Sequence, residues 1–150
     1  GRDLPVILLG DENAEHQVLI QGTVHAMEHM CSWLLMSMTE YYAARGGIED
    51  VCFHIIPMMN PDGVDLVTGA IPADSPEYAQ AAALGANYPG ISFPDGWKAN
   101  LLGVDLNLNY PAGWLQAREI KYMQGYDRPG PRDFVGPYPL SHQKPLACSS

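Results

Sequence analysis

Two apolar runs joined by a helical stretch constrain the fold of this chain most strongly. Residues 17–24 (QVLIQGTV) and 51–59 (VCFHIIPMM) are rich in β-forming side chains. Over residues 27–42, apolar side chains recur at the three- and four-residue spacing of a helix, and this apolar stripe centres near Leu34, which we expect to face the core. The order strand, helix, strand predicts a right-handed parallel crossover. We therefore expect an α/β fold.

The remaining predicted elements extend this architecture. Residues 5–10 (PVILLG) predict a strand that neighbours the strand at 17–24. Short helices are predicted around residues 75–84 and near residues 113–123, and Asn60-Pro61-Asp62-Gly63 predicts a turn. The 150 residues suffice for one domain. We expect a mixed, mainly parallel, twisted sheet flanked by helices.

The composition argues against two classes of partner. Eight Lys and Arg against seventeen Asp and Glu give a net charge of -9, so the chain lacks the basic surface that binds a phosphate backbone. Its apolar stretches are shorter than the roughly 20 residues of a membrane span, and no signal peptide opens the sequence. The three cysteines lack the spacing of a zinc site or a disulfide framework. We expect a soluble domain that binds no nucleic acid, and the sequence leaves its compartment open.

Three potential metal ligands, His25, Glu28 and His29, fall within the five residues HAMEH. His25 directly follows the predicted strand at 17–24, at the carboxyl edge where α/β folds place their sites. A histidine and a glutamate three residues apart can both reach one Zn²⁺ at about 2 Å. Zinc accepts this mixed nitrogen and oxygen set in catalytic sites, which keep a position for water. The arrangement predicts His25 and Glu28 as ligands, with a third ligand from elsewhere.

Other interpretations of these residues stay open. An HxxE pair also occurs by chance. HAMEH matches the HxxEH motif of the inverted zinc peptidases as well, in which His25 and His29 would bind the metal and Glu28 would act as the base. That motif normally lies within a helix, whereas His25 lies at the exit of a strand. On a helical wheel His29 points away from the apolar stripe, so the first hypothesis makes it a solvated helix residue.

Four separated stretches of the chain resemble the zinc carboxypeptidase family. They are HAMEHM at 25–30, IIPMMNPDGVD at 55–65, WKANLLGVDLNLNY at 97–110 and DFVGPYPLS at 133–141. Their order and spacing match the family too, and the opening GRDLPVILLG resembles the strand that precedes its metal segment. The chain is similar to the bacterial branch that resembles γ-D-glutamyl-L-diamino acid peptidases, which cut peptides derived from cell-wall stems.

The resemblance implies roles for five side chains. It makes His25 and Glu28 the first two zinc ligands. Asp105, in GVDLN, would accept the imidazole N–H of the first ligand and fix its tautomer. Asn107 would lie in the pocket for the terminal carboxylate of the substrate. Lys98 stands where the family has the arginine that polarises the scissile carbonyl, and its ammonium can still stabilise an oxyanion.

Leu108 departs from the family pattern in a way that bears on substrate binding. The family's DLNRN places an arginine here, whose planar fork grips a carboxylate in two places, and a leucine cannot do so. Met27 replaces another arginine, between the two predicted metal ligands, and His142 replaces an acidic residue. These differences leave the substrate preference open.

The resemblance also predicts that residues 1–150 are the amino-terminal part of a larger catalytic domain. The family's third ligand and its general-base glutamate would both follow Ser150, and a further strand and helix would precede GRDLP. The whole enzyme would hydrolyse peptide or γ-glutamyl amide bonds, cell-wall stem peptides among them, with zinc-activated water. The isolated chain is expected to be inactive, and a truncated domain can self-associate. The alternative is a non-catalytic peptide-binding or scaffold module with the same fold.

Overall fold

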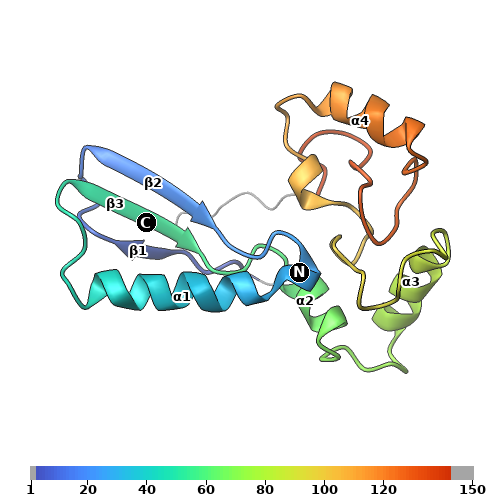
Figure 1. Cartoon of the computed structure of the whole chain (residues 1–150), viewed down its shortest axis with the longest axis horizontal. Helices are drawn as coiled ribbons and strands as arrows, with labels where there is room; N and C mark the ends of the chain where they lie inside the picture. Colours follow the sequence, from blue (N-terminus) through green and yellow to red (C-terminus); the bar gives the residue numbers. More distant parts are fainter. Residues whose placement is uncertain (1–2, 143–150) are drawn as a thin grey trace. The chain divides into compact units, whose positions relative to one another are not determined.

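The computed structural model describes residues 3–142, and these divide into two compact units (Figure 1). We call residues 3–24 and 28–59 the sheet unit, because the described strands lie there. We call residues 25–27 and 60–142 the loop unit, because coil and short helices make up most of it. The sequence-predicted site residues fall in both units.

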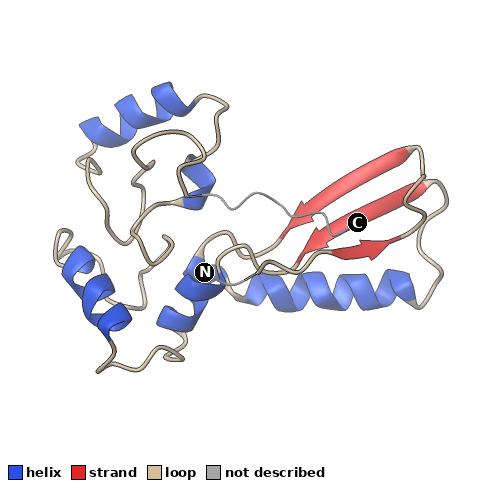
Figure 2. Ribbon diagram, turned by 180° about the vertical axis from the view of Figure 1, so that it is seen from behind, coloured by secondary structure: helices blue, strands red, loops and turns tan. Residues whose placement is uncertain are grey.

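Three strands form the sheet, in the order β1, β3, β2. β1 (Ile7–Leu9) pairs antiparallel with β3 (Val51–Ile56) over three residue pairs, and β2 (His16–Gln21) pairs parallel with β3 over six. Figure 2 shows the three strands side by side. The predicted mixed α/β architecture is confirmed, and its parallel pair is the longer one. β3 lies between the other two strands, so the expectation that the first two strands are neighbours is wrong.

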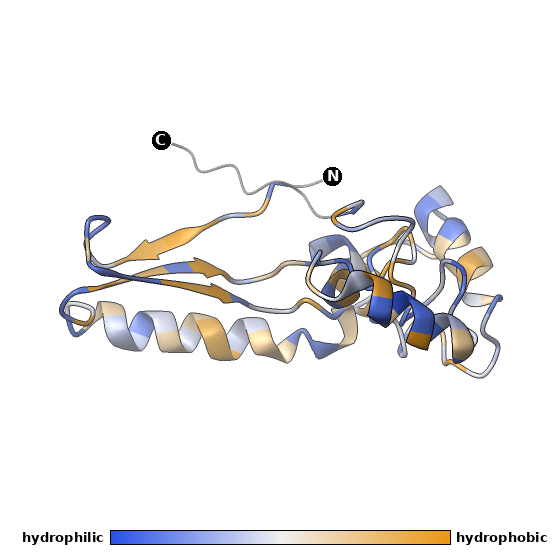
Figure 3. Cartoon of the chain, turned by 90° about the horizontal axis from the view of Figure 1, so that it is seen from above, coloured by the Kyte–Doolittle hydropathy of each residue, from blue (hydrophilic) through white to orange (hydrophobic). Residues whose placement is uncertain are grey.

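Helix α1 (Met30–Ala43) connects the parallel strands and runs along one face of the sheet (Figure 3). The ring of Tyr42 in the helix stacks on Phe53 of β3, with 6.2 Å between ring centroids. At the other end of the helix, the hydroxyl of Ser32 donates a hydrogen bond of 2.8 Å to the carbonyl of Pro57. The helix is therefore fixed to β3 and to the segment that follows it.

The buried side of α1 differs from the prediction by one residue. Leu34, expected at the centre of the core-facing stripe, is 74% exposed, whereas Leu35 is 7% exposed. Successive helical residues point about 100° apart, so this single step moves a side chain from the sheet to solvent. The apolar stripe is wider than the strip of helix that the sheet covers. The sheet contact selects a narrower set, Ser32, Leu35 and Thr39.

Trp97 lies at the centre of the core of the loop unit and is fully buried. Phe93 packs edge-on against it, with 5.8 Å between ring centroids. The indole N–H of Trp97 donates a hydrogen bond of 3.2 Å to the carbonyl of Asn100, which satisfies the polar edge of the ring. Small side chains and one leucine complete the buried cluster: Ala26, Leu66, Ala81 and Ala99.

A helix, α2 (Pro61–Val67), begins where the sequence predicted a turn. Asn60 caps it, because its side-chain oxygen accepts a hydrogen bond of 3.2 Å from the backbone N–H of Gly63. A Cβ atom at residue 63 would lie 2.8 Å from the carbonyl of Ala99, so a glycine permits this close approach. The turn prediction was wrong because Gly63 suggests a helix breaker, whereas here it serves packing.

The two other predicted helices are confirmed as α3 (Pro76–Gly85) and α4 (Trp114–Met123). Ser75 caps α3 by accepting a hydrogen bond of 3.2 Å from the backbone N–H of Tyr78. The longest described helix, α1, has 14 residues. Within residues 3–142, no helix has both the length and the apolar character needed to cross a membrane.

Candidate metal site

His25 is placed by backbone hydrogen bonds in the loop unit. It directly precedes the 3-10 turn η1 (Ala26–Glu28). The N–H of Ala26 donates to the carbonyl of Lys98, and the N–H of Met27 donates to the carbonyl of Trp97, both at 3.1 Å. Ala26 itself is fully buried. These hydrogen bonds hold residues 26 and 27 against residues 97 and 98, and His25 directly precedes them.

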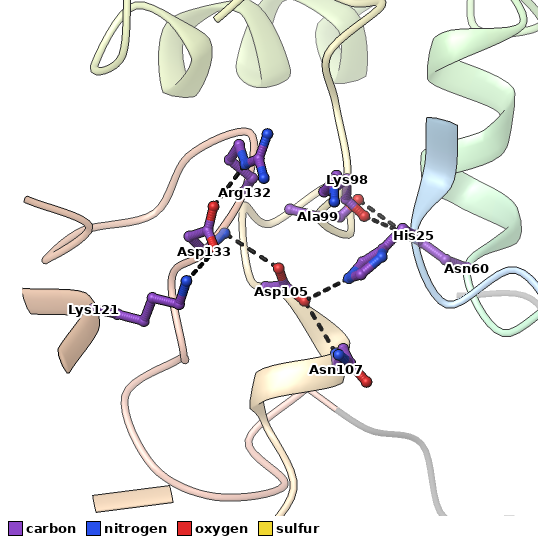
Figure 4. A network of polar contacts seen from close by, with 9 residues as sticks. All are labelled: His25, Asn60, Lys98, Ala99, Asp105, Asn107, Lys121, Arg132 and Asp133. Atoms are coloured by element: carbon purple, nitrogen blue, oxygen red, sulfur yellow. Dashed lines mark hydrogen bonds and ion pairs between the residues drawn. The ribbon is translucent and has the colours of Figure 1, made fainter. Parts of the chain in front are cut away.

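The imidazole of His25 meets the carboxylate of Asp105 (Figure 4). His25 Nε2 lies 3.2 Å from Asp105 Oδ1, and the two side chains are 18% and 4% exposed. Because an ionised carboxylate can only accept a hydrogen bond, such a contact favours the tautomer in which Nε2 carries the proton, and a metal would then use Nδ1. Carboxylates orient histidine ligands in zinc sites in this way. The structure thus contains the contact that was expected for Asp105. That this contact orients His25 for a metal ion remains a prediction.

Backbone groups fix the carboxylate of Asp105. Its Oδ1 accepts a hydrogen bond of 3.1 Å from the N–H of Asn107, and its Oδ2 accepts one of 3.2 Å from the N–H of Asp133. The N–H of Asp105 donates in turn to the carbonyl of Phe134 at 2.8 Å. Because both carboxylate oxygens accept N–H groups, this buried side chain is hydrogen-bonded and its orientation is fixed.

Lys98 is held by its backbone on both sides. Its N–H donates to the carbonyl of Pro131 at 2.8 Å. Its carbonyl, with that of Ala99, accepts hydrogen bonds of 3.3 and 2.9 Å from the side-chain amide of Asn60. Asn60 is 2% exposed, so this amide links the start of α2 to the segment that carries Lys98. The role of the Lys98 ammonium at a scissile carbonyl remains a prediction.

Asn107 and Leu108 lie on the turn that begins at Asp105, the 3-10 turn η2 (Leu106–Leu108). Asn107 is exposed and Leu108 is half-buried. The N–H of Leu108 donates a hydrogen bond of 3.1 Å to the carbonyl of Asp105. The structure therefore brings both predicted substrate-binding residues to the turn that also holds the His25 partner. Their contacts with a substrate remain predictions.

Sequence reasoning missed the buried amide of Asn109. This residue is fully buried. Its Nδ2 donates hydrogen bonds of 2.8, 3.0 and 3.0 Å to the carbonyls of Val135 and Tyr138 and to the hydroxyl of Ser141. Its Oδ1 accepts one of 3.1 Å from the backbone N–H of His142. The available signal was the second asparagine of LNLN, between apolar neighbours. Asn109 holds the loop that follows the Asp105 contact.

The carboxylate of Asp133 was also missed. It accepts hydrogen bonds of 2.6 Å from Lys121 Nζ of α4 and from Arg132 Nε. Burial opposes ionisation of this carboxyl, but the hydrogen bonds from Lys121 and Arg132 outweigh burial and lower the pKa of Asp133 below its ordinary value. Arg132 is its neighbour in the sequence, but nothing there marks the carboxylate as buried, because its contact with Lys121 forms only in the folded chain.

Glu28 and His29 belong to the sheet unit. Glu28 closes η1 and is exposed, and His29 is the N-cap residue of α1. His29 is half-buried, and its Nδ1 is buried without a hydrogen-bond partner in the described part of the chain, so the expectation of a solvated side chain is wrong. Within residues 3–142, no group of three or more His, Cys, Asp or Glu side chains is arranged to hold a metal ion.

The comparison with protein families gives one match over nearly the whole chain. Residues 1–143 match the profile of the zinc carboxypeptidase family. This range includes each of the six site residues named from the sequence: His25, Glu28, Lys98, Asp105, Asn107 and Leu108.

Individual relatives point in the same direction. The γ-D-glutamyl-L-diamino acid endopeptidase 1 of Lysinibacillus sphaericus is 31% identical over 97% of this chain and 38% of its own length. The uncharacterized protein YqgT of Bacillus subtilis is 28% identical over 98% of this chain and 41% of its own length. The human carboxypeptidase N catalytic chain is 31% identical over 74% of this chain and 24% of its own length. The chain thus spans well under half the length of these relatives.

Proposed function

Because the chain belongs to the zinc carboxypeptidase family, we propose that it contributes His25 and Glu28 as two ligands of a catalytic zinc ion in a peptidase. The observation that carries this proposal is the 3.2 Å contact between His25 Nε2 and the buried carboxylate of Asp105. A carboxylate that engages one nitrogen of an imidazole fixes the tautomer in which the other nitrogen can bind a metal.

The donor chemistry of these residues fits zinc. A histidine nitrogen and a glutamate oxygen form a set that Zn²⁺ accepts, together with one more protein ligand and a water. Residues 3–142 contain no group of three such ligands, so we place the third ligand and the general base outside them. A zinc ion bound here would supply a Lewis acid and would lower the pKa of a bound water. Asp105 would hold His25 in the Nε2–H tautomer, and Lys98 would offer its ammonium to the developing oxyanion.

The proposed reaction is hydrolysis of a peptide or γ-glutamyl amide bond, with cell-wall stem peptides as the candidate substrates. The name of the Lysinibacillus sphaericus relative, a γ-D-glutamyl-L-diamino acid endopeptidase, supports this substrate class. Asn107 would contact the substrate. Leu108 offers no charge to a terminal carboxylate, which favours substrates that are recognised through additional polar groups. We propose that residues 1–150 alone lack peptidase activity, because two ligands without a general base do not activate water.

Titration calorimetry with Zn²⁺ tests the ligand assignment on the chain itself. We expect weak binding by the unmodified chain, no measurable binding by His25→Ala or Glu28→Ala, and unchanged binding by His29→Ala. A dominant loss in His29→Ala would instead support the HxxEH arrangement. Absence of zinc binding in all forms would favour the alternative, a non-catalytic peptide-binding module. Robust zinc-dependent hydrolysis by residues 1–150, abolished by His25→Ala, would refute the proposed inactivity.

A further inference from the structure

Asp133 lies one hydrogen bond beyond the partner of His25. Its backbone N–H donates to Oδ2 of Asp105, the carboxylate oxygen that does not face the imidazole. The carbonyl of the next residue, Phe134, accepts the N–H of Asp105 at 2.8 Å. Residues 133 and 134 are therefore hydrogen-bonded to Asp105 at its carboxylate and at its backbone N–H. The contact with Asn107 is local, whereas Asp133 comes from 28 positions away.

The backbone of Asp133 has a conformation that favours glycine. Its φ angle is 66°, in the left-handed region that residues with a Cβ atom seldom adopt. Aspartate and asparagine tolerate this region better than most residues do, but they do not enforce it. The backbone of Asp133 lies between its own N–H and the carbonyl of Phe134, the two groups that bind Asp105. Both hydrogen bonds to Asp105 therefore depend on the left-handed conformation of Asp133.

The side chain of Asp133 supplies the restraint. Its two oxygens are bound separately, Oδ1 by Lys121 Nζ and Oδ2 by Arg132 Nε, each at 2.6 Å. Asp133 is 9% exposed, so its carboxylate is largely shielded from solvent, and the side chains of Lys121 and Arg132 are 24% and 37% exposed. The lowered pKa of the carboxyl agrees with an ionised group held by two cations. Figure 4 shows the resulting chain of contacts from Lys121 through Asp133 and Asp105 to His25.

We propose that Asp133 is a positioning residue for His25, because its ion pairs with Lys121 and Arg132 hold a left-handed backbone whose N–H fixes the Asp105 carboxylate. The effect on the imidazole follows from the geometry of the loop unit alone. The effect on zinc rests, in addition, on the proposed function. A purely structural ion pair between α4 and the loop would stabilise the fold without changing the tautomer of His25.

The test reads the imidazole directly, by long-range ¹H–¹⁵N correlation spectra of the metal-free chain at about pH 8.5, above the ordinary histidine pKa. The unmodified chain should show His25 in the Nε2–H tautomer. Asp133→Ala removes both the restraint and the tolerance of the left-handed region, so we expect a mixture of the two tautomers. Asp133→Asn keeps that tolerance and one acceptor oxygen, and should stay close to the unmodified chain. Asp133→Gly keeps access to the left-handed region but loses the carboxylate, so its tautomer mixture should lie between those of Asp133→Ala and Asp133→Asn.

Asp127→Asn is the matched control, since it breaks an exposed ion pair with Arg128 in the same unit. It should leave the tautomer unchanged. If folded Asp133→Ala shows the same Nε2–H tautomer as the unmodified chain, the positioning role is wrong. If Asp133→Ala fails to fold, a chain that carries both Lys121→Met and Arg132→Met loses both cations, and an unaltered His25 tautomer in that chain would overturn the proposal equally. Zinc affinity should fall about tenfold in Asp133→Ala. A changed tautomer with no zinc binding in any form would leave the positioning role standing and refute the zinc ligand assignment.

Discussion

The two units of this chain are stabilised by different chemistry. The sheet unit relies on ladder hydrogen bonds and on one helix, and it leaves large apolar side chains of that helix exposed, including Trp33 at 71% and Leu34 at 74%. The loop unit has little regular structure, and buried polar side chains hold its coil segments together. Three of them, Asn60, Asp105 and Asn109, are at most 3% exposed and accept or donate to backbone groups.

This difference suggests how the site is built. Regular elements satisfy their own backbone groups, whereas coil must find partners elsewhere. In the loop unit, asparagine and aspartate side chains are those partners, and one of them, Asp105, also contacts His25. Substitution of a buried polar group should therefore cost more in the loop unit than truncation of an exposed apolar side chain costs in the sheet unit.

The largest expected effect is on Asn109. Asn109→Leu keeps the approximate volume but leaves the carbonyl of Tyr138 and the N–H of His142 without this partner, whereas the carbonyl of Val135 keeps its hydrogen bond of 3.1 Å from Trp114 Nε1. We expect a loss of about 4 kcal/mol in the free energy of unfolding, because each buried unpaired group costs roughly 1–3 kcal/mol. Urea denaturation, followed by the fluorescence of the buried tryptophans 97 and 114 of the loop unit, measures it.

Asn87→Leu is the control for this substitution. Asn87 is exposed, and its side-chain amide donates a hydrogen bond of 3.0 Å to the carbonyl of Pro129. It should cost less than about 1 kcal/mol. Equal losses in the two variants would mean that buried amides do not stabilise the loop unit in the way described.

Two adjacent leucines of α1 give the next largest contrast, in the sheet unit. Leu35→Ala removes a buried side chain and should cost about 2–3 kcal/mol, whereas Leu34→Ala removes an exposed one and should cost less than about 0.5 kcal/mol. Hydrogen exchange of the β3 amides measures both. The reverse order would show that the sequence-derived stripe centred on Leu34 is the buried face.

The regular elements could be predicted from the sequence because their signals are local. The spacing of apolar residues over 27–42 predicted α1, and the run at 51–59 predicted β3. The buried side of α1 could not be predicted, because the sheet covers only part of a wide apolar stripe. Helix α2 was missed because Gly63 has a packing role that depends on Ala99, 36 positions later.

The candidate site likewise contains residues that the sequence predicted and residues that it did not. The resemblance to the zinc carboxypeptidases placed Asp105 beside His25, and the structure contains that contact. Asn109 carries only a weak local signal, an asparagine between apolar neighbours, and Asp133 carries none. The left-handed backbone of Asp133 and its contact with Lys121, 12 positions earlier, form only in the folded chain, whereas its other cation, Arg132, is its neighbour in the sequence. Sequence reasoning identifies residues that match a motif, and it misses those that hold the motif in place.

In the loop unit a substitution can also change function. Leu108→Arg would restore a cation on the turn that follows Asp105, where the family pattern has an arginine. In a catalytically active protein that carries this sequence, we expect it to improve cleavage of simple peptides with a free carboxyl terminus by about 1–3 kcal/mol in transition-state binding. The measurement is kcat/KM on paired free-acid and amidated peptides. A strong preference of the unmodified enzyme for the free acid would mean that another residue binds the carboxylate.

The smallest expected effect is a pH dependence at His142. Burial lowers the pKa of this histidine, so the unfolded chain takes up a proton at a higher pH than the folded chain does. The stabilisation is complete above the ordinary histidine pKa of about 6.5 and declines as the pH falls from there towards the lower pKa of the folded state. His142→Gln should reduce the change in the free energy of unfolding over this pH range by less than about 1 kcal/mol, since solvent screens a half-buried charge. Unfolding curves at about pH 7.5 and pH 5.5 test it, and an unchanged slope would exclude His142 as the source.

The central claim is that the buried Asp105 carboxylate prepares His25 to bind zinc. The most direct measurement is the zinc affinity of Asp105→Asn beside that of Asp127→Asn, which also neutralises one aspartate of the loop unit but lies at an exposed ion pair. We expect the affinity of Asp105→Asn to be 10- to 100-fold weaker, because loss of the partner of a histidine ligand has about that effect. The affinity of Asp127→Asn should be unchanged. Equal zinc affinities in the two folded variants would contradict the claim.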